Sequence, residues 1–190
     1  MILFINACVR PQSRTKKLAE HFLEKLHQDI KEVNLEKENP MPLNREALER
    51  RTKLSSEGLF DDPMFHFAKD FAKADKIVIA APFWDLSFPA LLKCYIEQIN
   101  IIGLTFAYGH DGKPYGLCQA DELIYITTSG GTISDDSAGF GYIKSLAQNF
   151  YGIKNVSCIK AENLDLIGAD VESILNQAKK EIDTIFSSSL

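Results

Sequence analysis

The sequence predicts an α/β fold in which one parallel sheet of five strands is covered by helices on both faces. Short apolar runs alternate with longer segments whose apolar residues recur at helical spacing, a pattern typical of strand–helix–strand crossover units. The clearest run is 77–81 (IVIAA), which is rich in β-branched residues and is stopped by Pro82. A central strand that is buried on both faces has this composition.

The other elements follow from the same two patterns. Residues 2–6 (ILFIN) form the first strand, and 15–29 form a helix with Leu18, Phe22 and Leu26 on one face. Residues 36–46 contain two prolines and are expected to be a loop. The remaining expected strands are 31–35, 123–128 and 156–160, and the remaining expected helices are 44–54, 63–74, 89–101, 137–150 and 169–186.

Segment 103–118 departs from this alternation. It contains the turn-forming triplet His110-Asp111-Gly112 between two short aromatic stretches. Such chemistry favours a β-hairpin that lies outside the main sheet.

Size and composition limit the classes of protein that fit. The chain has 190 residues, 45% of them hydrophobic, which predicts a single domain over 1–190. Its net charge is -5 without a dominant basic cluster, so neither nucleic acid nor an anionic membrane is expected as a partner. The four cysteines are widely spaced without a C-x-x-C pair, which predicts reduced thiols and no metal site. Residues 1–7 are too short for a signal peptide and no apolar stretch is long enough for a membrane span, so a cytoplasmic location is expected.

In a parallel α/β sheet, ligands bind beyond the carboxyl ends of the strands. The loop after the first strand carries Arg10, Ser13, Arg14 and Thr15 where a helix begins. Free backbone N–H groups, hydroxyls and guanidinium groups at such a position favour a phosphate site. Simple N-capping by Ser13 explains part of the same pattern. The loop has neither the G-x-G-x-x-G nor the G-x-x-x-x-G-K-[ST] spacing, which disfavours a dinucleotide site or a P-loop.

The loop after the third strand, 81–89, concentrates aromatic residues. Phe83, Trp84 and Phe88 lie where solvent or a ligand is expected, and Trp84 is the only tryptophan of the chain. A flat aromatic ligand stacks well on such a surface. Capping of the core, or a contact between subunits, is the alternative interpretation.

The loop after the fourth strand, 127–132, contains Gly130 and Gly131. Paired glycines let a backbone approach a ligand closely, although an ordinary strand-to-helix turn needs them too. An anion site, an aromatic wall and a glycine-lined rim at one sheet edge together fit a ligand with a phosphate tail and a flat polar ring. FMN has this shape.

The motifs resemble those of the FMN-dependent NADH azoreductases, which are relatives of the flavodoxin-like NAD(P)H:quinone oxidoreductases. The resemblance covers nearly the whole chain. It rests on the order and spacing of several motifs, namely Ser13-Arg14-Thr15, residues 80–86 (AAPFWDL), 92–97 (LKCYIE), 103–108 (GLTFAY) and 128–131 (TSGG). It implies a flavodoxin-like fold with strand order 2-1-3-4-5.

The resemblance also implies roles for individual residues. Ser13, Arg14 and Thr15, supported by Arg10, are expected to hold the phosphate of a noncovalent FMN. Tyr108 and Phe150 correspond to aromatics on the substrate side of the flavin. The expected ring, ribityl and pyrimidine-edge contacts are Pro82, Phe83, Trp84, Asp85, Leu86, Thr128, Ser129, Gly130 and Gly131. The family is dimeric with each flavin near the subunit boundary, which predicts a homodimer.

Three positions depart from the family pattern. Asp85 replaces the usual Asn beside the flavin, and a carboxylate there disfavours a reduced, anionic flavin. Ala7 or Cys8 stands where the family has a serine near the phosphate. Ser129 stands where some members carry Arg.

These observations predict a ping-pong reaction in which NADH or NADPH reduces the flavin and a quinone or azo compound reoxidises it. Tyr108 or His110 is a candidate proton donor. A flavodoxin-type electron carrier without its own substrate and an NAD(P)H:FMN reductase remain as alternatives. A receiver-like module is disfavoured, because Asn6 and Ala7 follow the first strand in place of an acidic pair.

Overall fold

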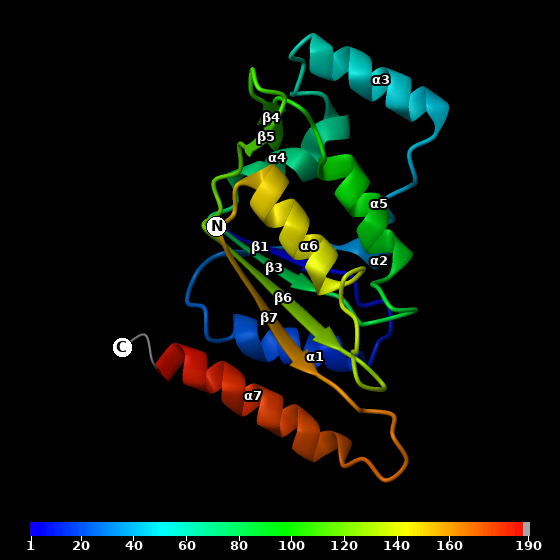
Figure 1. Cartoon of the computed structure of the whole chain (residues 1–190), viewed down its shortest axis with the longest axis vertical. Coiled ribbons are helices and arrows are strands. Elements are labelled where there is room, and N and C mark those ends of the chain that lie inside the picture. Colours follow the sequence, from blue (N-terminus) through cyan, green and yellow to red (C-terminus); the bar gives the residue numbers. More distant parts are fainter. Residues whose placement is uncertain (188–190) are drawn as a thin grey trace.

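The computed structural model describes residues 1–187 and has a five-stranded parallel sheet at its centre (Figure 1). The strand order is β2-β1-β3-β6-β7, and every neighbouring pair is parallel. With the main-sheet strands counted along the chain, this is the predicted order 2-1-3-4-5. The five strands are β1 (Ile2–Asn6), β2 (Ile30–Asn34), β3 (Lys76–Ala80), β6 (Glu122–Thr128) and β7 (Asn155–Ala161).

Helices connect the strands and cover the sheet. Among residues 1–187, no helix is both long and apolar enough to cross a bilayer. The helices are α1 (Arg14–Leu23), α2 (Leu35–Glu38), α3 (Arg45–Ser56), a 3₁₀ turn at Pro63–Phe65, α4 (His66–Lys73), α5 (Ala90–Ile99), α6 (Phe140–Leu146), a π-helical turn at Ala147–Tyr151 and α7 (Val171–Ser187).

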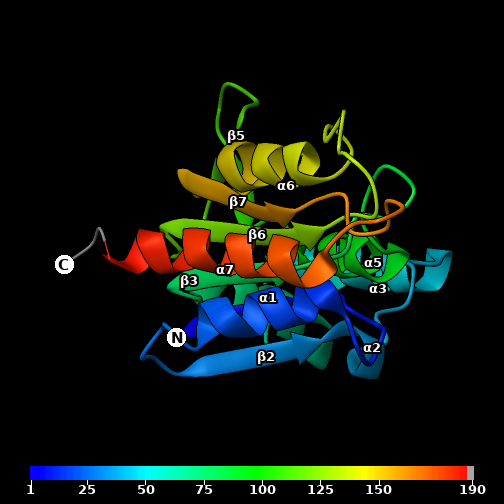
Figure 2. The same cartoon turned by 90° about the horizontal axis from the view of Figure 1, so that it is seen from below.

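The alternation of side chains along each strand creates two hydrophobic cores. In β1, Leu3 and Ile5 face the layer of α4, α5 and α6, whereas Ile2 and Phe4 face α1 and α7. Figures 1 and 2 show these helix layers on opposite sides of the sheet. Because both faces are covered, functional groups are accessible chiefly at the ends of the strands.

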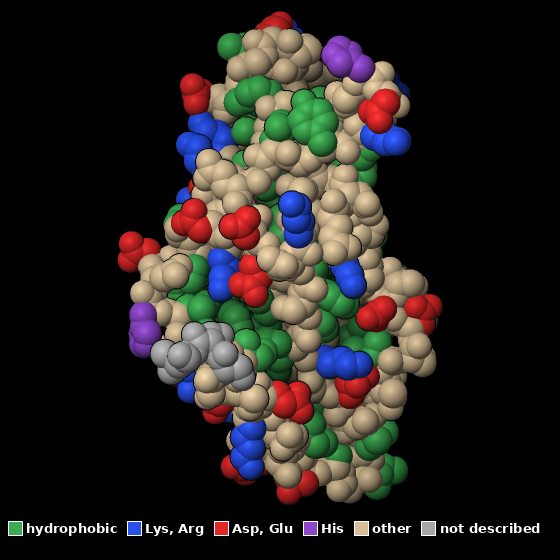
Figure 3. Space-filling model, turned by 60° about the vertical axis from the view of Figure 1, so that its left-hand side comes forward, with side chains coloured by type: hydrophobic (Ala, Val, Ile, Leu, Met, Phe, Trp, Pro, Cys, Tyr) green, Lys and Arg blue, Asp and Glu red, His purple; other side chains and the backbone are tan. Residues whose placement is uncertain are grey.

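The excursion after α5 forms the predicted hairpin. Strands β4 (Phe106–Tyr108) and β5 (Pro114–Gly116) pair antiparallel, and Gly112 in their turn has φ of 75°. Tyr108 and Tyr115 are about half exposed on it. Figure 3 shows hydrophobic side chains at the upper end of the molecule, with charged side chains of both signs around and below them.

Three predicted boundaries are wrong. The helix expected over 15–29 ends at Leu23. The expected loop 36–46 is partly occupied by α2, and the Asn34 side chain caps the first amides of this helix. The helix expected over 137–150 begins at Phe140, because Gly139 and Gly141 both donate backbone hydrogen bonds to the carbonyl of Asp136.

Candidate functional site

The carboxyl ends of β1, β3, β6 and β7 meet at one edge of the sheet and surround a cavity of about 400 Å³. This volume lies in the range of small-molecule sites. Ten of the thirteen predicted cofactor residues line it: Arg10, Ser13, Arg14, Thr15, Pro82, Phe83, Trp84, Thr128, Ser129 and Gly130.

The amino end of α1 forms one wall of the cavity. The Ser13 side chain accepts a hydrogen bond from the backbone N–H of Lys16, so the predicted N-cap is present. Arg14 and Thr15 are the first two residues of the helix, and their amides have no carbonyl within the helix to bond. These N–H groups and the positive end of the helix dipole favour an anion here.

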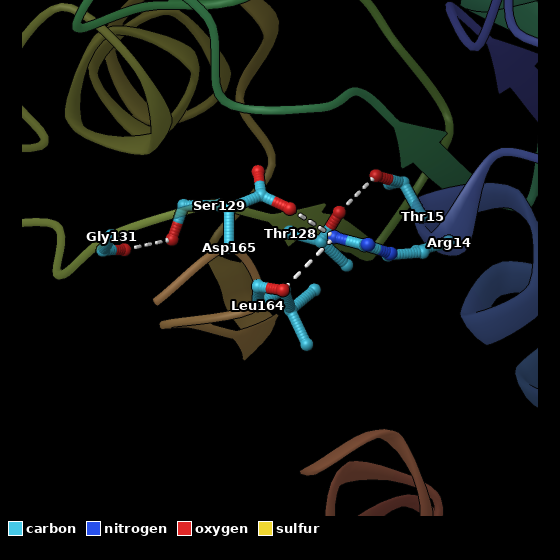
Figure 4. Close-up of polar contacts among 7 residues, drawn as sticks. All are labelled: Arg14, Thr15, Thr128, Ser129, Gly131, Leu164 and Asp165. Atoms are coloured by element: carbon cyan, nitrogen blue, oxygen red, sulfur yellow. Dashed lines mark hydrogen bonds and ion pairs between the residues drawn. The ribbon is translucent and has the colours of Figure 1, made fainter. Parts of the chain in front are cut away.

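Thr15 and Thr128 join the first wall to the third loop. Their hydroxyl oxygens lie 2.6 Å apart, and both side chains are buried (Figure 4). This bond fixes the start of α1 against the end of β6. It leaves each hydroxyl with further capacity to bond a ligand oxygen.

The second loop supplies the aromatic wall. Phe83 and Trp84 are half-buried, and the backbone N–H of Phe83 donates to the carbonyl of Thr128. The Arg10 guanidinium carbon lies 5.4 Å from the centre of the Trp84 ring, within cation–π range. The loop therefore presents a flat apolar surface beside a positive charge.

Asp85 and Leu86 lie just outside the cavity lining, at the tip of this loop. Both have positive φ, 51° and 62°, and Trp84 and Ser87 exchange backbone hydrogen bonds around them. Left-handed backbone costs a non-glycine residue roughly 1 kcal/mol or more, and such strain is concentrated at ligand-binding sites. Leu86 is also 67% exposed.

The loop after β7 forms a fourth wall that the sequence interpretation missed. Leu164 and Asp165 line the cavity, and Asp165 accepts a hydrogen bond from Arg14 (Figure 4). The strand predicted at 156–160 ends at the same edge as the other three, and this shared edge is the signal that identifies the fourth loop. Gly131 lies next to this wall but outside the lining, where its carbonyl accepts a hydrogen bond from Ser129 Oγ.

Cys8 also lines the cavity, and Ala7 or Cys8 is the residue that stands where the resembling family has a serine. Burial raises the pKa of its thiol to about 11, and the Sγ atom lies 3.6 Å from the carbonyl oxygen of Ala80. The group is therefore a neutral thiol at pH 7. It adds no negative charge to an anion site and is a poor nucleophile there.

Tyr108 and Phe150 do not line the cavity. They pack on either side of Phe106, with ring centroids 5.6 Å and 4.8 Å from it, beside the hairpin. Figure 1 shows the hairpin on the side of the amino ends of the strands, away from the cavity. Both aromatics therefore lie away from the cavity of their own chain.

Comparisons with known proteins agree with this architecture. A family model described as flavodoxin-like fold matches residues 1–186. The FMN-dependent NADH:quinone oxidoreductase 2 of Clostridium acetobutylicum is 39% identical over 186 residues, which cover 92% of each chain. The FMN-dependent NADH:quinone oxidoreductase of Lachnoclostridium phytofermentans is 36% identical over 189 residues, which cover 95% of this chain and 94% of that protein.

Solved structures give the same result. The azoreductase from Bacillus anthracis str. Sterne superimposes with a TM-score of 0.84 at 25% identity, and the match covers 98% of both chains. Sequence and structure thus agree over nearly the full length, and the chain belongs to the flavodoxin-like fold family Flavodoxin_2.

Proposed function

We propose that the chain is an FMN-dependent NADH:quinone oxidoreductase that also accepts azo compounds. Two relatives with at least 36% identity over nearly the whole chain are named for the quinone reaction. The observation that carries the proposal is the single cavity that combines a helix amino terminus and two arginines with an aromatic wall.

The cavity residues fit the two ends of FMN. Arg10, Arg14 and the hydroxyls of Ser13 and Thr15 suit a phosphate, because they supply charge and hydrogen-bond donors at a helix amino terminus. For the ring and ribityl chain, the cavity residues are Pro82, Phe83 and Trp84, with Asp85 and Leu86 just outside the lining. For the pyrimidine edge they are Thr128, Ser129 and Gly130, with Gly131 next to them.

When bound, FMN accepts a hydride from a nicotinamide and returns two electrons to an acceptor. Phe83 and Trp84 are the residues that would hold the ring, and they would shield it from water on that side. Cys8 takes no part as a nucleophile, because its pKa of about 11 keeps the thiol protonated at neutral pH.

We further propose a homodimer, which accounts for the position of the hairpin. Tyr108 and Phe150 lie outside the cavity of their own chain, and Tyr108 is about half exposed. In a dimer with each flavin near the subunit boundary, these aromatics reach the flavin of the second chain. Size-exclusion chromatography with light scattering tests the oligomeric state directly.

Visible absorption of the purified protein tests the function. After incubation with FMN and gel filtration, the protein is expected to retain the yellow flavin spectrum. Addition of NADH without oxygen is expected to bleach it, and a quinone is expected to restore it.

Three different outcomes would contradict the proposal. A flavin that stays oxidised in NADH indicates an electron carrier. A flavin that is reduced but leaves the protein during gel filtration indicates an NAD(P)H:FMN reductase. A colourless protein that ignores FMN indicates a flavin-free domain.

A further inference from the structure

Arg14 and Asp165 join two walls of the cavity that are distant in sequence. Arg14 Nη1 lies 2.7 Å from Asp165 Oδ1 and 3.3 Å from the carbonyl oxygen of Leu164. Figure 4 shows the arginine side chain extending from α1 toward the loop after β7. A guanidinium suited to an incoming phosphate is thus already bound to a carboxylate of the chain itself.

Asp165 is the only carboxylate among the described residues that line the cavity, where Arg10 and Arg14 supply the positive charge. Asp165 therefore disfavours the binding of a phosphate dianion in the cavity in two ways. The carboxylate repels the phosphate, and it occupies hydrogen-bond donors of Arg14.

The backbone holds Asp165 in this position. Its N–H donates to the carbonyl of Gly130 at 2.9 Å, and the N–H of Leu164 donates to the carbonyl of Ser129 at 3.1 Å. A Cβ atom on Gly130 would overlap the Asp165 carboxylate, so the missing side chain leaves room for it. The Asp165 side chain is 68% exposed, and it can therefore rotate into solvent while its backbone stays paired.

We propose that Asp165 is a built-in competitor of the cofactor phosphate for Arg14 and that it sets how tightly the site holds FMN. The inference rests on the proposed function. In the structure, Asp165 holds Arg14 across the cavity. The phosphate dianion takes over the guanidinium, and Asp165 turns outward. Because this exchange breaks an ion pair, FMN is bound more weakly than the same cavity would bind it without the carboxylate.

Titration of the Asp165→Asn variant with FMN tests the proposal, with the quenching of flavin fluorescence as readout. The variant keeps the side-chain shape and loses the charge. Its Kd for FMN is expected to fall about threefold to fivefold, the upper part of the range that one partly exposed ion pair supplies. Riboflavin serves as the probe without phosphate, and its Kd is expected to stay within about twofold of wild type.

Asp121→Asn is the matched control. Asp121 is exposed and directly precedes β6, at the opposite edge of the sheet, so its substitution changes the net charge equally. Its Kd for FMN is expected to equal that of wild type. If this variant binds FMN as tightly as Asp165→Asn, the effect belongs to net charge and the proposal is wrong.

The Arg14→Met background tests whether Asp165 acts through Arg14. Arg14→Met alone is expected to weaken FMN binding, and adding Asp165→Asn is expected to give a much smaller gain than in wild type. An undiminished gain, or an Asp165→Asn variant that binds FMN no more tightly than wild type, would overturn the inference. If all the proteins fail to bind FMN, the proposed function falls as well, so the two failures are distinguishable.

Discussion

At the scale of single residues, the Thr15–Thr128 contact involves hydroxyls that are expected to contribute both to stability and to cofactor binding. The two hydroxyls are 2.6 Å apart, and each side chain is buried, at 1% and 7% exposure. A hydroxyl in that position bonds its neighbour and has capacity left for a ligand oxygen. One substitution should therefore lower both stability and cofactor affinity.

The variant Thr15→Val keeps the shape of the side chain and removes its hydroxyl. It leaves the Thr128 hydroxyl buried without its partner, which is expected to cost about 1–3 kcal/mol of the free energy of unfolding. Loss of a hydrogen bond to a charged phosphate is expected to weaken FMN binding about tenfold or more. Urea unfolding and flavin fluorescence titration measure the two effects.

Thr15→Ser is the matched control for that variant. It retains the hydroxyl and loses only a methyl group, so both quantities are expected to stay close to wild type. Equal losses in the serine and valine variants would show that packing of the methyl group, and not the hydroxyl, accounts for the role of Thr15.

The sequence predicted most of the residues that line the cavity, because they follow strands in a pattern that needs no three-dimensional information. Arg10, Ser13 and Trp84 each stand in a loop that follows a strand, and that strand is readable from its apolar run. Asp165 was missed because its role depends on a partner 151 residues away. The position of Tyr108 relative to the cavity could not be predicted, because local motifs do not show at which end of the sheet a hairpin lies.

At the scale of elements, the length of α1 follows from the strand it accompanies. Ile2 of β1 pairs in register with Ile30 of β2, so the chain must return to the same end of the sheet between them. A helix of 10 residues spans about 15 Å, close to the roughly 16 Å of a strand of 5 residues. The apolar periodicity that continues to Leu26 therefore outlasts the helix, and Leu26 packs on the core from the following turn.

The hairpin lies very close to the π-helical turn, and this contact predicts how a substitution in the hairpin changes stability. At Gly116 in β5, a Cβ atom would overlap the backbone of Tyr151 and Gly152. Backbone atoms cannot rotate aside, so Gly116→Ala must push the hairpin away from the turn. A loss of about 1–3 kcal/mol in the free energy of unfolding is expected, measured by urea denaturation.

Gly131→Ala is the stability control for that substitution. Gly131 has open space where a Cβ would lie, and its backbone φ is not positive. Its free energy of unfolding is expected to match wild type. The hairpin contributes no residue to the cavity of its own chain, so Gly116→Ala is expected to act on stability without changing the lining of that cavity.

At the scale of the whole molecule, the fold was predictable because the sheet is buried on both faces. Such strands are continuous apolar runs, and the five predicted strands agree with the structure to within one residue at each end. The helices were less predictable, since caps and backbone contacts such as the Asp136 carbonyl decide where they begin. The contact between Arg14 and the β7 loop depends on the assembled fold and has no local signature.

The many buried acids of the two cores predict how stability depends on alkaline pH. Burial raises the pKa of Cys8 from 9.0 to about 11 and those of Cys118 and Cys158 from 9.0 to about 12. Burial likewise places the pKa values of Tyr95 and Tyr151 well above 10. Below pH 9 both the folded and the unfolded chain keep these protons, so their contribution to stability is fully present.

Above pH 9 the unfolded chain releases thiol protons that the folded chain retains, so the free energy of unfolding is expected to fall steadily toward pH 12. Urea midpoints measured under reducing conditions from about pH 7 to pH 11 give the profile. A variant with Cys8, Cys118 and Cys158 all changed to Ala is expected to have a lower free energy of unfolding than wild type at pH 7. Over the first unit above pH 9, its free energy of unfolding is expected to decline less steeply than that of wild type, because the tyrosines release their protons only at higher pH. A wild-type profile that stays flat up to about pH 11, or a variant that declines as steeply as wild type, would show that the buried thiols do not control alkaline unfolding.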